Sequence, residues 1–477
     1  MKACKRQPAA VLSSFPAPDD AASEAMLKKA LAGFRKKIVV LDDDPTGTQT
    51  VHDVSVFTDW EESSLLEGFQ EDSPLFFVLT NSRSFSAEET ARVHARIAER
   101  ICKAARKTGK DFFVVSRGDS TLRGHYPLET ETLREGISSA AGFDFDGEIL
   151  CPFFPEGGRY TFGNVHYVKE GNELVPAGMT EFARDQTFGY SSSDLTDYVA
   201  EKTGGVYPAE NCVCISLEEL RRGDAETVFQ KLTAARDFAK IIVNATAYAD
   251  LNVFCAALAR AEKSGKHFLA RTAAAFPKVL ADISDRPLLS GKELECAGDQ
   301  NGALILVGSH VKKTTDQLEA LAKSGLKLKF VEFHVNAFFE ENGLEAEVNR
   351  IVREAETLIA QGTTTVIYTS RKLLIPRGKD REEILRASVE ISNSLTGIIT
   401  RLQEKPRFLL AKGGITSSDV ATKALGIRKA RVMGQIRPGI PVWMTGAESK
   451  FPGMPYIIFP GNVGEISTLR EIVEEFL

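Results

Sequence analysis

Three apolar runs near the start of the chain decide its fold: KIVVLDDD (37–44), PLFFVLTNS (74–82) and DFFVVSRGDS (111–120). Each run has the length and composition of a buried strand, and each ends in a polar loop. Residues 86–107, between the second and third runs, begin with Ser, carry acids in the first turn and end with bases, which indicates a helix. The order strand–helix–strand predicts a parallel sheet in an α/β domain.

The second half of the chain shows the same alternation. Helices are expected near 313–325, 342–360 and 381–403, and strands are expected at 303–309, 326–333, 363–370, 407–414, 430–434, 440–445 and 456–461. A polar segment, 284–302, has the composition of a linker between the two series.

The predicted fold class is therefore α/β, with two domains, each built on a mainly parallel sheet flanked by helices, and a cleft between them. We expect an N-terminal tail over 1–35, one domain over 36–285 and another over 300–477. Residues 151–195 are rich in Gly, Pro, Phe and Tyr and show little periodicity, so they are predicted to form an irregular binding loop.

Composition excludes several classes of protein. The 477 residues are 43% hydrophobic and 26% charged, which rules out a mainly disordered chain. A net charge of −6 argues against non-specific binding of nucleic acid. No apolar run approaches the roughly 20 residues needed to cross a bilayer, and Pro and Ser interrupt the N-terminal apolar stretch, unlike a signal peptide. Seven scattered cysteines favour a reducing, cytoplasmic setting.

Three loops of the second half follow a predicted strand and precede a predicted helix. Glycine lets backbone N–H groups approach a ligand closely, and a helix N-terminus adds free donors, which together suit phosphate. Each loop alone could be an ordinary connection with a Ser cap, but three at one edge of a parallel sheet would converge on a nucleotide. The candidate residues are Gly308, Ser309, Gly413, Gly414, Thr416, Ser417, Gly461, Asn462 and Gly464.

The first half offers a cluster of acids and arginines. Asp42, Asp43 and Asp44 end the first strand, and adjacent carboxylates repel unless a cation or donors lie nearby. The third strand opens into a loop with Arg117, Asp119 and Arg123, and a guanidinium group suits a carboxylate or phosphate. Solvated turns would also explain these loops. Arg159 and His166 follow in the irregular stretch, where a lone histidine is more often structural than catalytic.

At these residues the chain resembles the four-carbon acid sugar kinase family, which are ATP-dependent kinases of acids such as threonate, erythronate and 3-oxo-tetronate. The matching motifs are DDPTG (43–47), DSTLRG (119–124), FPEGGR (154–159) with GNVHYV (163–168), and the three glycine loops of the second half. The resemblance spans about 36–474 and keeps the order of the motifs. Departures include a third acid at Asp42 and an arginine at Arg117 where many relatives carry lysine.

The resemblance implies that the first domain holds a sugar acid and the second holds ATP, with Mg²⁺ bridging phosphate oxygens. In this reading Arg117, Arg123, Arg159 and His166 contact the substrate, and Asp43, Asp44 or Asp119 binds its hydroxyls and accepts the proton. No metal ligands can be identified, and a homo-oligomer is possible for a family of this size. A nucleotide-binding sensor without turnover is the alternative, whereas a dehydrogenase would need a GxGxxG fingerprint that the sequence lacks.

Overall fold

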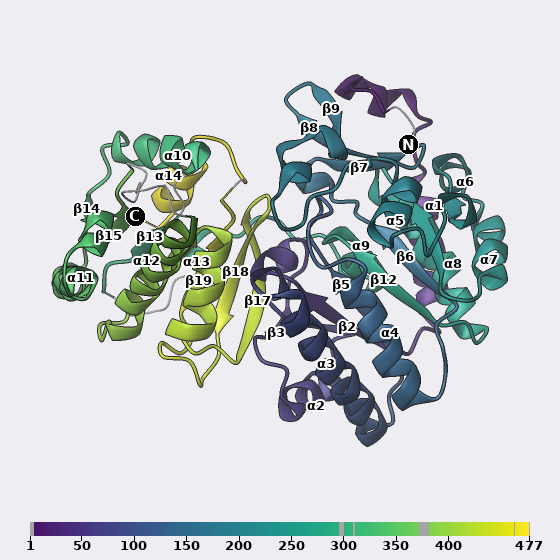
Figure 1. The fold of residues 1–477 in the computed structure, drawn as a ribbon, viewed down its shortest axis with the longest axis horizontal. Helices are drawn as coiled ribbons and strands as arrows, with labels where there is room; N and C mark the ends of the chain where they lie inside the picture. The colour runs from purple at the N-terminus through teal and green to yellow at the C-terminus, as the bar shows by residue number, and fades with distance from the viewer. Residues whose placement is uncertain (1–3, 295–299, 309–310, 372–380, 462, 477) are drawn as a thin grey trace. The chain divides into compact units, whose positions relative to one another are not determined.

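The computed structural model describes residues 4–294, 300–308, 311–371, 381–461 and 463–476 (Figure 1). Two compact units make up the chain. The first comprises Met1–Thr50 and Asp59–Asp285, and the second comprises Val51–Thr58 and Arg286–Leu477. Both are α/β structures with mostly parallel sheets, which confirms the predicted fold class.

The first unit is built on a parallel sheet in which the three opening runs are neighbours. Its strands are buried along most of their length, as expected for a sheet with helices on its faces. Their order across the sheet is β10 (Val213–Ile215), β11 (Ala239–Val243), β6 (Gly147–Cys151), β12 (Phe268–Thr272), β5 (Phe112–Arg117), β2 (Lys37–Asp42) and β4 (Leu75–Leu79).

The helices of this unit form two packed groups, one around α3 and one around α8 (Figure 1). The predicted helix at 86–107 is α3 (Ala87–Thr108): the Ser86 side chain accepts from the Glu89 N–H, and Gly109 ends the helix at a φ of 66°. The other helices are α1 (Asp20–Leu31), α2 (Glu62–Gln70), α4 (Leu128–Ala141), α5 (Leu195–Lys202), α6 (Leu217–Arg221), α7 (Ala225–Ala234), α8 (Tyr248–Lys263) and α9 (Ala275–Leu280).

Two segments are more regular than the sequence suggested. The stretch predicted as an irregular loop contains β7 (Arg159–Phe162), β8 (Val165–Glu170) and β9 (Glu173–Pro176), which form a small antiparallel sheet with β1 (Gln7–Pro8). The expected tail contains α1, which buries Leu27 and packs on α8. The strands β7, β8 and β9 gave only a weak signal because each is four to six residues long, and β1 pairs with a segment far along the chain.

The second unit combines a parallel and an antiparallel part in one sheet. Strands β19, β16, β13, β15 and β14 are parallel, while β3, β17 and β18 continue the sheet in antiparallel pairing. Their bounds are β3 (Val54–Phe57), β13 (Leu304–Val307), β14 (Leu328–Phe333), β15 (Thr364–Thr369), β16 (Leu409–Lys412), β17 (Lys429–Arg437), β18 (Ile440–Thr445) and β19 (Pro455–Phe459).

The helices of the second unit follow its strands in the predicted order. They are α10 (Lys312–Ala322), α11 (Gly343–Ala360), α12 (Arg381–Arg401), α13 (Gly414–Asp419) with a π-helical continuation (Val420–Ala424), and α14 (Thr468–Glu474). No helix among the described residues is both long enough and apolar enough to span a membrane.

One strand of the second unit comes from the first half of the sequence. Residues 51–58 belong to the second unit, where β3 pairs with β17. The Asp53 N–H donates to the Val432 carbonyl over 2.7 Å, and the Asp53 carboxylate pairs with Arg431 and Arg286. A four-residue strand is too short for its partner to be inferred from its own sequence.

Candidate functional site

The acidic cluster lies where β2 ends beside β5 in the first unit. Asp42 is the last residue of β2, and Arg117, its partner in register, is the last residue of β5. The Arg117 Nη1 atom lies 2.9 Å from the Asp42 carboxylate and 3.3 Å from those of both Asp43 and Asp44. Arg117 is buried, so its single guanidinium group contacts three carboxylates at the end of the strand with little exposure to water.

Arg83 supplies a second guanidinium group to the same carboxylates. It lies in a short 3₁₀ segment (Ser82–Ser84) after β4 and pairs with Asp43, Asp44 and Asp119. The Asp119 N–H in turn donates to Asp43 over 3.1 Å. The sequence analysis missed Arg83, although β4 was predicted and the carboxyl ends of neighbouring parallel strands meet at one edge.

The acids differ in how readily they lose a proton. Burial raises the pKa of Asp42 from 3.8 to about 7, although the Arg117 charge opposes the shift, and burial also raises the pKa of Asp43. Burial acts on Asp119 too, but Arg123 and Arg83 outweigh it and hold the pKa of that carboxyl well below its usual range. The cluster therefore holds an ionised Asp119 beside two carboxyls, Asp42 and Asp43, that keep their protons to a higher pH than usual.

Gly47 explains how three acids fit at the end of one strand. A Cβ atom at this position would overlap the Asp42 carboxylate, so the turn Pro45–Thr50 folds back onto the strand only because Gly47 has no side chain. The backbone N–H of Thr46 donates to Asp44 over 2.8 Å, which fixes that carboxylate as well.

Arg123 and Arg159 meet over one aromatic ring. Their guanidinium carbons lie 5.0 and 5.9 Å from the centre of the Phe182 ring. Arg123 is already paired, because its Nε donates to Asp119 over 2.7 Å. In the described part of the chain no carboxylate pairs with Arg159, whose Nε is buried without a hydrogen-bond partner and whose pKa is lowered by burial. Arg159 is therefore the guanidinium group best prepared for an external anion.

His166 has a different place from the one expected. The side chain is fully buried, its Nδ1 lies 2.9 Å from the Thr161 hydroxyl, and its Nε2 lies 2.8 Å from the Ser120 carbonyl oxygen. Burial lowers the pKa of His166 to about 4. This geometry does not support the expected contact with substrate, because both ring nitrogens are already engaged, Nε2 with Ser120 in the 119–124 loop and Nδ1 with Thr161 in β7.

Arg271, at the end of β12, also shapes this loop and was missed by the sequence analysis. It donates to the Ser116 hydroxyl over 2.9 Å and pairs with Glu129. A Cβ atom at either Gly118 or Gly124 would overlap the Arg271 guanidinium group, so these glycines allow the loop to lie across it. No motif in the sequence pointed to Arg271, because its strand ends in an unremarkable ARTAAA stretch.

The three glycine loops of the second unit come together. A Cβ atom at Gly308 would overlap the Thr416 hydroxyl, so the loops after β13 and β16 touch. The Gly413 N–H donates to the Phe459 carbonyl over 2.9 Å, and the Thr314 hydroxyl at the start of α10 donates to the Gly461 carbonyl over 3.4 Å. The loops after β13, β16 and β19 therefore form one surface at the carboxyl edge of the parallel strands.

The candidates within these loops are not equivalent. Gly414 has open space where a Cβ would lie, which suits close approach of a ligand. The Ser417 hydroxyl is fully buried and donates to the carbonyls of Ala411 and Gly413, so it stabilises the loop from within. Gly464 adopts a left-handed φ of 80° before α14. Ser309 and Asn462 lie outside the described residues.

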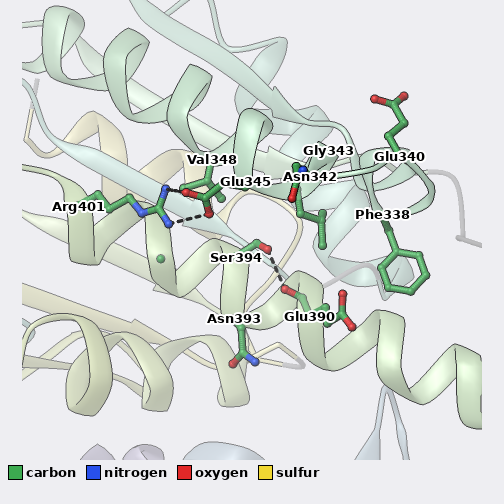
Figure 2. A pocket seen from close by; sticks show the side chains of 12 residues that line it. Phe338, Glu340, Asn342, Gly343, Glu345, Val348, Glu390, Asn393, Ser394 and Arg401 are labelled. Carbon is green, nitrogen blue, oxygen red and sulfur yellow. Dashed lines mark hydrogen bonds and ion pairs between the residues drawn. The ribbon is translucent and has the colours of Figure 1, made fainter.

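A pocket of about 380 Å³ lies between the start of α11 and the middle of α12 (Figure 2). Arg401 in its wall is paired with Glu345 through two contacts of 2.7 and 2.8 Å. Glu340 and Glu390 add further carboxylates, so the lining is acidic. Such a lining disfavours a phosphate group, because the carboxylates repel its negative charge.

The carboxylates of Asp42, Asp43 and Asp44 offer one oxygen each within 4.8 Å of one another, the spacing of a cation site. Arg117 and Arg83 already pair with all three of them. The residues present therefore fit a guanidinium-filled cluster better than a site for Mg²⁺, and any Mg²⁺ that enters with ATP would be held by the phosphate oxygens.

Comparisons with known proteins agree with the two units. Residues 38–280 match the family model of a sugar-binding N-terminal domain, and residues 304–469 match that of a nucleotide-binding C-terminal domain. No curated protein matches the sequence.

Solved structures share the fold. A crystal structure from Salmonella typhimurium LT2 is 16% identical over 92% of this chain and 99% of that chain, with a TM-score of 0.65. A Haemophilus influenzae protein of family-model DUF1537 is 17% identical over 92% and 100%, with a TM-score of 0.59. A Bordetella bronchiseptica protein, crystallised as a domain-swapped dimer with bound citrate, has a TM-score of 0.38, too low to support an inference.

The two family models together cover most of the chain, in the order and at the positions where the acid–arginine cluster and the glycine loops lie. The protein therefore belongs to the four-carbon acid sugar kinase family, with a sugar-binding N-terminal domain and a nucleotide-binding C-terminal domain.

Proposed function

We propose that the protein is an ATP-dependent kinase that phosphorylates a hydroxyl group of a four-carbon sugar acid of the threonate, erythronate or 3-oxo-tetronate type. The observation that carries this proposal is the Arg159 guanidinium, which pairs with no carboxylate among the described residues, near an ionised Asp119 in a sugar-binding domain. A cation for the carboxylate and an acceptor for the hydroxyls are what a sugar acid requires.

The anion-binding role falls first to Arg159. Arg123 already donates to Asp119, so it would position that carboxylate and contribute its remaining donors. Both guanidinium groups flank Phe182, whose ring limits their movement. Arg117 is buried under the acidic cluster and would act on the substrate only through the carboxylates that it holds.

The hydroxyl groups of the substrate would be bound by the accessible acids. Asp44 and Asp119 have side chains that are 17% and 13% exposed, whereas Asp43 is 2% exposed. Asp44 would accept the proton from the attacking hydroxyl, because the pKa of Asp119 lies too far below its usual range for that carboxylate to take up a proton. Asp119 would bind a substrate hydroxyl, while Asp43 holds the 119–124 loop through the Asp119 N–H. When bound, ATP and Mg²⁺ supply the phosphoryl group and neutralise its charge.

The test is a coupled assay of ADP release with a panel of four-carbon acids. We expect turnover that depends on one acid, and Arg159→Met should raise KM for that acid about 10–100-fold, the value of one or two hydrogen bonds to a charged group. ATP affinity should be unchanged. The matched control is Arg260→Met, which removes an exposed ion pair with Glu226 far from the cluster.

The alternative is a sensor that binds nucleotide without turnover. Nucleotide binding with no acid-dependent ADP release would favour it over a kinase. An equal loss of affinity for acid and ATP in Arg159→Met would contradict the role assigned to Arg159.

A further inference from the structure

A fully buried lysine lies among the glycine loops of the nucleotide-binding domain. Lys412 is the last residue of β16, and none of its side chain is exposed. Its Nζ atom lies 3.5 Å from the centre of the Phe459 ring and donates to the Pro460 carbonyl over 3.3 Å. In the described part of the chain no carboxylate pairs with Lys412. A buried ammonium without an anion is costly, so a structural lysine is expected to have a carboxylate partner.

The surroundings of Lys412 favour an anion. Lys412 donates to the Pro460 carbonyl, and Thr314, in the first turn of α10, donates to the next carbonyl, Gly461. The dipeptide Pro460–Gly461 therefore accepts hydrogen bonds both from Lys412 and from the first turn of α10. Val311, the N-cap of α10, has no side-chain acceptor, and the first turn contains no acid. The positive end of the helix dipole lies here and attracts negative charge.

The charged groups around Lys412 do not neutralise it. On α10, Lys313 adds a second positive charge, and Lys312 is paired with Asp316. On α13, Asp419 is paired with Lys423 over 2.8 Å. The neighbouring strands contribute Val307 and Phe459, which carry no charge. Burial, reinforced by Lys313, lowers the pKa of Lys412 to about 7.

We propose that Lys412 is a phosphate-binding residue of the nucleotide site, which takes up a proton as a phosphate group of the nucleotide pairs with its amine. This inference rests on the proposed use of a nucleoside triphosphate and adds a residue that no motif of the family resemblance includes. In the free protein near pH 8 the amine is mostly neutral, and an anion beside it restores the ammonium form. Binding should therefore weaken as pH rises.

Calorimetry with ADP tests the proposal on the full chain. Titrations at pH 8.0 in two buffers of different ionisation enthalpy give the number of protons taken up. We expect roughly one proton per ADP at pH 8.0 and clearly less at pH 6.5, with affinity falling up to tenfold for each pH unit above about 7.5. The absence of this uptake in the wild type would overturn the proposal without any variant.

Two variants sharpen the test. Lys412→Met should remove the proton uptake and weaken ADP binding about 10–100-fold at pH 7. Lys323→Met, which removes an exposed lysine at the other end of α10, should behave like the wild type. Unchanged affinity and proton uptake in Lys412→Met would refute the role of Lys412 alone. If the wild type bound no ADP, the proposed function itself would fall, and this inference with it.

Discussion

In the sugar-binding domain two guanidinium groups balance the carboxylates of Asp43 and Asp44, beside an Asp42 carboxyl whose pKa is raised to about 7. In the nucleotide-binding domain, by contrast, a buried amine lies among main-chain groups. The first cluster is a permanent part of the fold, since it ties the ends of β2, β4 and β5 together. The second is incomplete until an anion arrives. Charged groups that stabilise a site already have partners of opposite charge within the protein. Charged groups that bind a ligand do not have such partners until the ligand is bound.

The largest effect is expected where the balanced cluster is broken. Arg117→Met leaves three carboxylates with one guanidinium group and should cost about 3–5 kcal/mol of unfolding free energy, the usual cost of removing one partner from a buried ion pair. The two tryptophans allow a clean measurement, because Trp60 lies in the first unit and Trp443 in the second. Urea unfolding followed by Trp60 in a Trp443→Phe background would report the first unit.

Arg260→Met in the same background is the control and should change stability by less than about 1 kcal/mol, because the pair with Glu226 is exposed. Equal effects of the two substitutions would mean that Arg117 is not the centre of the cluster.

Removing the buried amine of Lys412 should change the free energy of unfolding in the opposite direction. Lys412→Met should stabilise the ligand-free protein at pH 7, by at most about 4 kcal/mol once the lost hydrogen bond is deducted. The pKa of Lys412 falls from 10.5 in the unfolded chain to about 7 in the folded protein. Between these values the unfolded chain holds the proton, so wild-type stability rises with pH and the advantage of the variant fades toward pH 10.5. The measurement is urea unfolding followed by Trp443 fluorescence at pH 7, 8.5 and 10. A difference in unfolding free energy between variant and wild type that stays constant over this pH range would contradict the prediction.

Asp42, in the cluster of the first unit, should make the stability of the protein depend on pH in the opposite direction. Its pKa rises from 3.8 to about 7 on folding, so the folded protein binds more protons between these values and wild-type stability falls as pH rises through them. Asp42→Asn should therefore gain about 1–3 kcal/mol at pH 8, after the loss of a charge-assisted bond to Arg117. Below pH 4 the gain should vanish. A variant that is less stable at every pH would show that Asp42 stays ionised.

The smallest effects compare two glycines. Gly47→Ala should cost about 1–3 kcal/mol because its Cβ would overlap the Asp42 carboxylate, whereas Gly414→Ala should change stability by less than about 0.5 kcal/mol, since its Cβ would meet open space. Gly414→Val should nevertheless abolish ADP binding, because the larger side chain would block approach to the backbone. Normal ADP affinity in Gly414→Val, measured by calorimetry, would remove Gly414 from the nucleotide site.

Much of this architecture follows from local sequence. The runs that became β2, β4 and β5 are apolar on both faces, and α3 has its cap, charges and terminal glycine in order, so the parallel sheet could be predicted. The motifs that contain Asp43, Asp119 and Arg159 were visible for the same reason: each directly follows or opens a recognisable element. What failed were short strands, such as β3 and β1, whose partners β17 and β9 lie far along the chain.

Local sequence specifies the types of side chain that end each strand, because polar residues at those positions must leave the sheet for a loop. It does not specify which of them balance each other. Arg83 joins the acids only because β4 lies beside β2. His166 turns inward because its Nε2–H donates to the Ser120 carbonyl and its Nδ1 accepts from the Thr161 hydroxyl. Among the described residues Lys412 has no carboxylate partner, because its neighbours in space are a ring and a carbonyl. Charge balance is a property of three-dimensional neighbours, and so is the distinction between a structural charge and one that awaits a ligand.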